Sequence, residues 1–193
     1  MISGIILAAG KGSRMGNDKL ALPLEGKPIL EHVIMSAKQS KLDEIILVWG
    51  RYRSSKELAE KYGIYACENK GFEMGMSTSI ISGLGCISPQ SEGVMFLLGD
   101  MPFVKALHIN GLIETYEKNP KGIVMPMCDG KRGNPVLFSK IFYEELKQLK
   151  GDIGARGLIT KHMEQVTSVT FYEDSTLRDI DTQEEYGKYR RGI

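Results

Sequence analysis

The chain has 193 residues, of which 42% are hydrophobic and 25% charged, and its formal net charge is +1. A domain of this size buries roughly 70% of the surface of its unfolded chain, so we expect a single domain over residues 1–193. The near-neutral charge excludes a global field that would attract nucleic acid or an acidic membrane. An anionic ligand would therefore need a local cluster of cations.

The three cysteines, Cys67, Cys86 and Cys128, are odd in number, far apart and without CxxC spacing. This pattern predicts neither a disulfide framework nor a zinc site, and it favours reduced thiols in a cytosol. The N-terminal apolar run is too short for a signal peptide, and no apolar stretch is long enough to span a membrane. We therefore expect a cytoplasmic protein.

The first nineteen residues combine a β-branched apolar run, residues 2–7, with a glycine-rich basic loop. Glycine leaves room for backbone N–H groups to close around phosphate, and the cations supply charge. The glycines and cations of this loop are Gly10, Gly12, Gly16, Lys11, Arg14 and Lys19. We interpret the segment as a strand that leads into a nucleoside triphosphate site.

Strands and helices alternate in the following part of the chain. Pro28 fits the first turn of a helix that continues to about residue 40, and Ser77 is a candidate N-cap for a helix that begins near Thr78. Between and after these helices we predict a strand at 44–49, a helix at 54–63, and strands at 64–67 and 94–98.

The second half continues the alternation. Asp129-Gly130 predicts a hairpin turn, and Thr182 with Glu185 has the spacing of a capping box at the C-terminal helix. The remaining predicted elements are helices at 105–117, at 140–149 and after 151, and strands at 123–127, 135–138 and 166–172.

This order of elements predicts an α/β fold with a mostly parallel central sheet that is covered by helices on both faces. Ligands of such sheets bind outside the carboxyl ends of the strands. The basic loop lies at that edge, and so does Asp100, which follows the apolar strand at 94–98. A carboxylate there is a suitable ligand for the Mg²⁺ that accompanies a triphosphate.

A glycine-rich turn without a ligand is the alternative interpretation of the N-terminal loop. Neither standard phosphate motif fits, because the loop lacks the GKS or GKT of a Walker A sequence. A GxGxxG motif that starts at Gly10 would need glycine where Met15 stands. The residues alone therefore leave both interpretations open.

Six segments together resemble one known family. They are LAAGKGSRMGNDKLALP, GMSTSIISGL, LLGDMP, GKRGNP, GDIGAR and DIDTQEEY, in this order over nearly the whole chain. The set is similar to the MobA-like NTP transferase family, which includes molybdenum cofactor cytidylyltransferases and guanylyltransferases. The resemblance implies a three-layer α/β/α domain of the nucleotide-diphospho-sugar transferase (Rossmann-like) fold.

The resemblance also implies nucleotide contacts. Arg14 and Lys19 would neutralise phosphate charge in catalysis, and Asp100 would bind Mg²⁺. The base would lie beside Leu7, Ala8 and Ala9, and the phosphates beside Gly10, Gly12, Ser13, Arg14, Gly16 and Lys19. The pyrimidine and ribose would lie near Gly75, Ser77 and Ser79.

Acceptor contacts are implied less directly. Asn134 stands in GKRGNP where the family commonly has histidine. Arg156 is a better candidate to hold an acceptor phosphate than Lys131 or Arg132, which also fit solvated surface positions. Asp181 is either a second metal ligand or a carboxylate that favours the N-terminus of the last helix.

Met74 and Met76 flank the implied base region. Core packing is the default interpretation of a methionine, and contact with the acceptor pterin is the alternative.

The implied reaction is transfer of CMP from CTP to the terminal phosphate of molybdopterin or its metal-bearing form, with release of pyrophosphate. CTP is favoured over GTP because the cytidylyl branch typically has LAAG, as Ala8-Ala9-Gly10 does here, where the guanylyl branch has LAGG. One alternative is a nucleotidyltransferase for another phosphorylated acceptor, such as a sugar or polyol phosphate. Another is a non-catalytic accessory protein that carries the cofactor to a molybdenum hydroxylase client.

Overall fold

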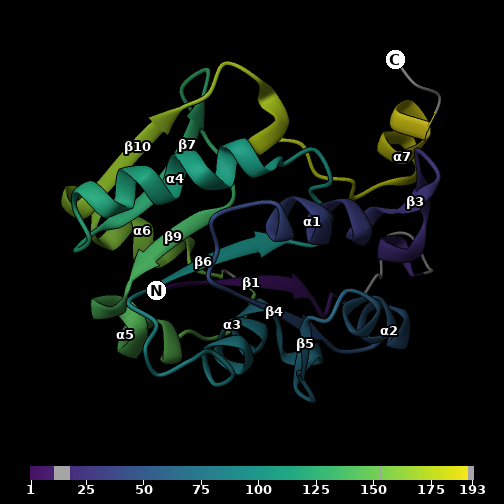
Figure 1. The fold of residues 1–193 in the computed structure, drawn as a ribbon, viewed down its shortest axis with the longest axis horizontal. Coiled ribbons are helices and arrows are strands. Elements are labelled where there is room, and N and C mark those ends of the chain that lie inside the picture. Colours follow the sequence, from purple (N-terminus) through teal and green to yellow (C-terminus); the bar gives the residue numbers. More distant parts are fainter. Residues whose placement is uncertain (11–17, 153, 191–193) are drawn as a thin grey trace.

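The computed structural model describes residues 1–10, 18–152 and 154–190, and it is built around an eight-stranded sheet (Figure 1). The strand order is β10-β7-β9-β6-β1-β4-β5, and β8 pairs with β7. The strands are β1 (Ile2–Ala8), β4 (Glu44–Trp49), β5 (Tyr65–Glu68), β6 (Gly93–Leu98), β7 (Ile123–Cys128), β8 (Lys131–Arg132), β9 (Val136–Ser139) and β10 (Val166–Thr170). A separate two-stranded sheet pairs β2 (Pro23–Leu24) with β3 (Lys27–Pro28).

Most neighbouring strands of the large sheet run parallel. Strand β1 is parallel to both β4 and β6, β4 is parallel to β5, and β10 is parallel to β7. Strand β9 is antiparallel to its neighbours β6 and β7. The predicted mostly parallel sheet is therefore confirmed, and β1 lies near its centre.

Helices cover both faces of this sheet. They are α1 (Ile29–Lys38), α2 (Arg53–Lys61), α3 (Met76–Leu84), α4 (Ala106–Lys118), α5 (Tyr143–Lys147), α6 (Arg156–Lys161) and α7 (Gln183–Arg190). Helices α1 and α4 bury side chains in one core cluster, and α3, α5 and α6 in another. In Figure 1, α1 and α4 accordingly lie on the opposite side of the sheet from α3 and α5.

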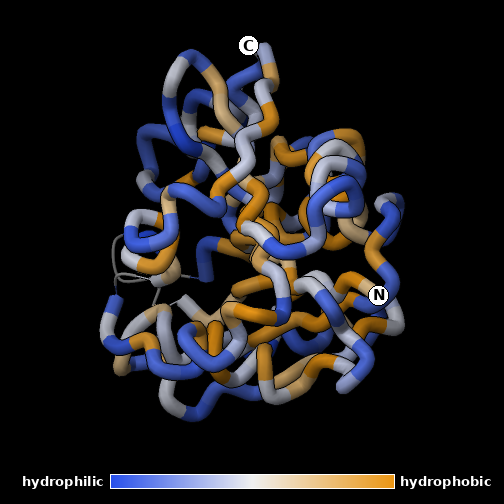
Figure 2. Tube along the Cα trace, turned by 90° about the vertical axis from the view of Figure 1, so that its left-hand side faces the viewer, coloured by the Kyte–Doolittle hydropathy of each residue, from blue (hydrophilic) through white to orange (hydrophobic). Residues whose placement is uncertain are grey.

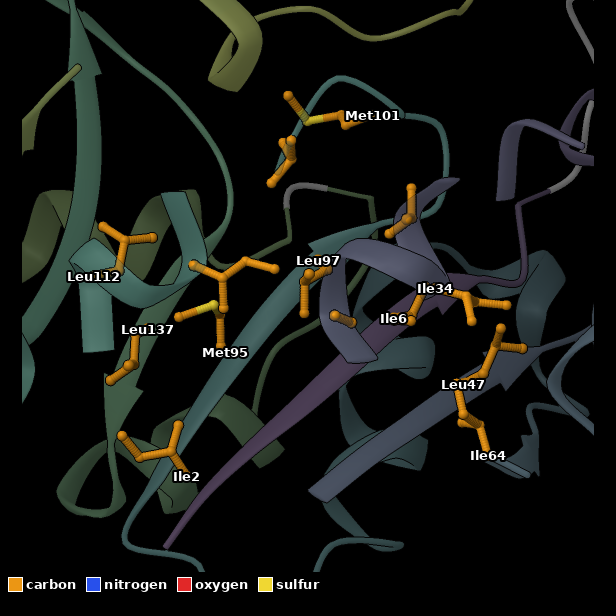
Figure 3. Close-up of a cluster of buried hydrophobic side chains, with 14 of the residues drawn as sticks. Ile2, Ile6, Ile34, Leu47, Ile64, Met95, Leu97, Met101, Leu112 and Leu137 are labelled. Atoms are coloured by element: carbon orange, nitrogen blue, oxygen red, sulfur yellow. The ribbon is translucent and has the colours of Figure 1, made fainter. Parts of the chain in front are cut away.

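The core follows from the two-residue period of the strands. Along β6, Met95 and Leu97 point into the cluster with α1 and α4, whereas Val94 and Phe96 point into the other. Figure 3 shows Met95 and Leu97 among the side chains of the first cluster. Each fully buried large aliphatic side chain contributes about 1.5–3 kcal/mol. Figure 2 shows the resulting concentration of hydrophobic residues in the interior.

Two helix boundaries differ from the predictions. Helix α3 begins at Met76 with Gly75 as its cap, so Ser77 is a buried helical residue and caps nothing. The predicted helix at 140–149 is divided into a 3₁₀ turn, Lys140–Phe142, and α5. In both places, tertiary packing decides the boundary, which local propensity leaves open.

The two predicted turn motifs are confirmed. Asp129 and Gly130 both have positive φ, at 48° and 74°, and they connect the antiparallel strands β7 and β8. At the start of α7, the Thr182 N–H donates to Glu185 Oε2 at 2.8 Å, and the Glu185 N–H donates to Thr182 Oγ1 at 3.2 Å. This capping box fixes the segment that carries Asp181.

The expectation of reduced thiols is wrong for two of the cysteines. Cys67 in β5 and Cys86, two residues after α3, form a disulfide with their Cα atoms 6.7 Å apart. The two cysteines are 19 residues apart in the sequence, and they come together because β5 and α3 are neighbours in the fold. Cys128 is a free, buried thiol.

None of the helices within residues 1–10, 18–152 and 154–190 has the length and apolarity needed to cross a lipid bilayer.

Candidate active site

The carboxyl ends of β1 and β6 define the candidate site. Gly99 follows β6 directly, and its N–H donates to the Leu7 carbonyl of β1 at 3.0 Å. The next residue, Asp100, accepts a hydrogen bond from the Ile180 N–H at its carbonyl oxygen, also at 3.0 Å. These bonds bring the turn after β6, the end of β1 and the segment before α7 together.

Lys19 lies between two carboxylates at this edge. Its Nζ is 2.8 Å from Asp100 Oδ2 and 2.6 Å from Asp181 Oδ1. The three side chains are 15%, 23% and 31% exposed, so water screens these contacts less than at an open surface. Lys19 is 81 positions from Asp100 and 162 positions from Asp181 in the sequence, so its ammonium group joins distant parts of the chain.

The electrostatics of this cluster keep Lys19 charged. Burial alone would lower the pKa of Lys19, but the Asp100 and Asp181 carboxylates outweigh that effect and raise the pKa above its ordinary value. The neighbouring Asp179 has a raised pKa because of burial and because of the negative charges of Asp100 and Asp181. The site therefore favours bound cations.

Asp100 and Asp181 fit a magnesium ion that is shared with a substrate. Their oxygens are hard donors, and they already converge on one cation, the Lys19 ammonium. Among the described residues, no group of three or more His, Cys, Asp or Glu side chains is arranged to hold a metal ion by itself. Two carboxylates are nevertheless sufficient, because Mg²⁺ commonly binds one or two of them together with phosphate oxygens and water.

The implied base region is compact. Ala8 and Ala9 are each 4% exposed, and Leu7 is partly buried. A Cβ built on Gly50 would lie 3.1 Å from Ala9 Cβ and 2.8 Å from Phe72 Cβ, so Gly50 is packed against both residues. Gly10 is exposed, whereas Gly12, Ser13, Arg14 and Gly16, together with Lys11, lie outside the described residues.

Asn69 organises the implied ribose region, and our sequence-based predictions missed it. This residue is 2% exposed, and its Nδ2 donates to Thr78 Oγ1 at 2.9 Å and to Ser79 Oγ at 3.0 Å. Its Oδ1 accepts from the Gly71 N–H at 2.9 Å. The only sequence signal was a side-chain amide directly after a strand. Ser77 and Ser79 are both buried.

The acceptor candidates lie on other elements. Asn134 donates its N–H to the Thr176 carbonyl at 2.9 Å just before β9, and Arg156 is the exposed first residue of α6. Within the described part of the chain, neither shares a hydrogen bond or ion pair with Lys19 or Asp100. Lys131 and Arg132 are exposed on β8, and Arg132 Nη2 lies 3.2 Å from Met163 Sδ.

Met74 and Met76 depart from the default interpretation as core residues. Their exposed fractions are 69% and 40%. Both therefore present apolar surface beside Gly75.

Comparison with known proteins identifies the family. Residues 4–166 match the model of the MobA-like NTP transferase domain. The purine catabolism protein PucB of Bacillus subtilis is 33% identical over 98% of this chain and 96% of its own. The molybdenum cofactor cytidylyltransferase of Escherichia coli is 32% identical over 96% and 93%.

Solved structures agree with this match. The crystal structure of Rv0371c from Mycobacterium tuberculosis has a TM-score of 0.85 at 25% identity and covers 100% of both chains. A second structure of that protein contains manganese, with a TM-score of 0.85 at 24% identity over 100% and 99% of the two chains. The sequence matches and the fold lead to the same conclusion: this chain belongs to the MobA-like NTP transferase family, whose members are nucleotidyltransferases.

Proposed function

We propose that the protein transfers CMP from CTP to the terminal phosphate of molybdopterin, or of its metal-bearing form, and releases pyrophosphate. The observation that carries the proposal is the Lys19 ammonium held between Asp100 and Asp181 at the carboxyl edge of the sheet. This arrangement suits a reaction in which negatively charged phosphates are brought together. The cytidylyltransferase of E. coli, similar over nearly its whole length, supports the choice of nucleotide and acceptor.

The proposed displacement needs no protein nucleophile. An oxygen of the acceptor phosphate attacks the α-phosphorus of CTP and forms a new P–O bond. The bond between the α-phosphorus and the oxygen that bridges it to the β-phosphorus breaks, and pyrophosphate leaves. Lys19 leaves its carboxylate partners to donate to phosphate oxygens, while Asp100 and Asp181 would hold Mg²⁺. Bound Mg²⁺ would supply charge neutralisation on the phosphates. Arg14 would add a second positive charge.

Nucleotide choice is proposed to depend on Ala9. Its methyl group lies next to Gly50, where a built Cβ would be 3.1 Å from Ala9 Cβ, and we propose that this methyl group leaves less room for a purine than glycine would. Discrimination by one methyl group is worth only about 1–3 kcal/mol. We therefore expect the protein to prefer CTP over GTP measurably, but not to exclude GTP.

On the acceptor side, we propose that Arg156 and Asn134 bind the acceptor phosphate. The exposed Met74 and Met76 are proposed to contact the pterin, because both offer apolar surface near Gly75. The name of the B. subtilis relative places that protein in purine catabolism. A molybdenum hydroxylase that oxidises a purine is accordingly the client that we propose.

A different phosphorylated acceptor is the second candidate, since the family match reports nucleotide handling more than acceptor identity. The cytoplasm remains our predicted location. The cysteines no longer support it, because Cys67 and Cys86 are joined in a disulfide.

Ligand-induced thermal stabilisation is the first test. CTP, GTP, ATP and UTP are compared at equal concentration with Mg²⁺, because a ligand that binds the native state raises its stability by mass action. We expect the largest rise in melting temperature with CTP. Equal shifts for all four nucleotides would contradict the role of Ala9.

Pyrophosphate release is the second test. We expect release in a mixture of Mg²⁺, CTP and molybdopterin, and none when molybdopterin is omitted. Release with a sugar phosphate in place of molybdopterin would support the second candidate. Nucleotide binding without any release would identify a non-catalytic carrier.

A further inference from the structure

The start of α3, which carries the proposed nucleotide contacts Ser77 and Ser79, is hydrogen-bonded to Gly151 and Asp152, which precede the proposed acceptor residue Arg156 in the sequence. The Ser77 N–H donates to the Gly151 carbonyl at 3.1 Å, and the Met76 N–H donates to Asp152 Oδ1 at 3.0 Å. Both donors lie in the first turn of α3, where backbone N–H groups have no partner inside the helix. Gly151 and Asp152 therefore act as an external N-terminal cap, supplied from a segment about 75 residues away in sequence.

Close backbone packing surrounds these two hydrogen bonds. A Cβ built on Gly75, whose φ is +110°, would lie 2.7 Å from both the carbonyl carbon and the oxygen of Gly151. A Cβ on Gly154 would lie 2.8 Å from Met76 Sδ. A side chain at position 75 would therefore collide with the Gly151 backbone, and at Gly154 the positive φ of 61° disfavours any residue with a side chain.

The other side of the same segment is anchored by β5. Asn69, directly after β5, donates to Thr78 and Ser79, and Thr78 Oγ1 lies 2.8 Å from the Gly75 carbonyl. The start of α3 is therefore supported from two directions, by Asn69 and by Asp152. Arg156, the first residue of α6, lies four positions after Asp152 in the sequence.

We propose that Asp152 is a positioning residue that couples the two substrate sides. It holds the start of α3, with Ser77 and Ser79, in register with the segment that carries Arg156. Occupation of one side then orders the other, and by thermodynamic linkage each substrate increases affinity for the other by the same factor. This inference rests on the proposed function, because it assigns Ser77 and Ser79 to the nucleotide and Arg156 to the acceptor.

Amide hydrogen exchange tests the contact without any activity measurement. In Asp152→Ala, the Met76 amide loses its acceptor, and we expect its exchange to become about fivefold faster, as for the loss of one ordinary hydrogen bond. Asp152→Asn keeps a side-chain oxygen and should restore slow exchange. Glu117→Ala, which removes an exposed carboxylate from α4, is the control and should leave Met76 unchanged. Unchanged exchange in Asp152→Ala would overturn the proposal.

Coupling is tested by adding Mg²⁺ and CTP. In the wild-type protein, we expect bound nucleotide to slow exchange across α6, and in Asp152→Ala this response should be lost. The KM values for CTP and for the acceptor should each rise about fivefold in Asp152→Ala, with kcat less affected. CTP binding that slows α6 exchange equally in both proteins would overturn the coupling alone. Failure of the wild-type protein to bind any nucleoside triphosphate would overturn both the proposed function and the coupling.

Discussion

At the scale of single residues, the most informative contact is that of Lys19 with Asp100. Removing Lys19 leaves the Asp100 and Asp181 carboxylates without their shared cation and removes a positive charge from the proposed phosphate site. We expect Lys19→Ala to lower the rate of pyrophosphate release by about 10²–10³, the usual cost of losing a preorganised electrostatic donor. Asp100→Asn should fold and lose activity, because it removes the negative charge of a proposed Mg²⁺ ligand.

Lys41→Ala is the matched control for Lys19→Ala. Lys41 also forms an ion pair, with Glu114 at 2.7 Å, but both side chains are more than half exposed and lie outside the candidate site. The rate of pyrophosphate release by Lys41→Ala should equal that of the wild-type protein. Turnover close to the wild-type value in Asp100→Asn or Lys19→Ala would contradict the assignment of this edge as the active site.

The residues that could be predicted from the sequence are those that lie inside recognisable motifs. Asp100 follows the most apolar strand, so its place at the sheet edge followed from the run of residues before it. Asn69 lies outside these motifs. Asp152 lies inside GDIGAR, but its role, like that of Asn69, could not be identified because it depends on a hydrogen bond to another segment. No local period or spacing rule reports such contacts.

At the scale of elements, strands that contain a long apolar run could be predicted from the sequence, whereas very short strands and contacts between elements could not. The prediction of strand β4 at 44–49 is confirmed, because the apolar run IILVW follows Glu44 and ends at Gly50. The short strands β2 and β3 were missed, since two-residue strands carry no periodicity. The Cys67–Cys86 disulfide was missed because it connects β5 to the region after α3, and that adjacency arises only in the folded sheet.

The disulfide leads to a prediction about these elements. It closes a loop between residues separated by 19 positions, and a loop of this length corresponds to about 3 kcal/mol of stability in the chain-entropy model. We expect Cys86→Ser to lower the free energy of unfolding by about that amount under oxidising conditions. Denaturant unfolding with and without a dithiol reductant measures the effect.

The reductant also provides the control for this prediction. It should destabilise the wild-type protein to the level of Cys86→Ser and leave Cys86→Ser itself unchanged. If complete reduction left the free energy of unfolding of the wild-type protein unchanged, the disulfide would contribute nothing to stability.

At the scale of the whole molecule, polar groups are divided between the two edges of the sheet. The carboxyl edge carries Lys19, Asp100 and Asp181, whereas the amino edge carries a hydrogen-bonded network that includes Ser91 and Tyr143. Further members of that network are Ser3 and Glu44, joined by a 2.6 Å hydrogen bond. The amino edge lies at the opposite end of β1, so its polar groups are expected to affect stability and not catalysis.

The dependence of stability on pH tests this expectation at Tyr143. Burial raises the pKa of Tyr143 to about 12, against an ordinary value of 10.0, although the Ser91 hydrogen bond acts in the opposite direction. Between these two values, the unfolded chain loses the phenolic proton while the folded protein keeps it. The unfolded state then binds fewer protons, so stability falls as pH rises from about 10 to 12.

Tyr143→Phe should remove this part of the alkaline destabilisation. At pH 8, we expect the variant to be about 1 kcal/mol less stable than the wild-type protein, because it lacks the hydrogen bond to Ser91. Between pH 10 and 12, its stability should improve relative to wild type by about 2–3 kcal/mol, so that the order of stabilities reverses. Tyr172→Phe is the control, since Tyr172 is 97% exposed and should show no such trend. A constant difference between Tyr143→Phe and wild type over this pH range, measured by denaturant unfolding, would contradict the burial of the phenol.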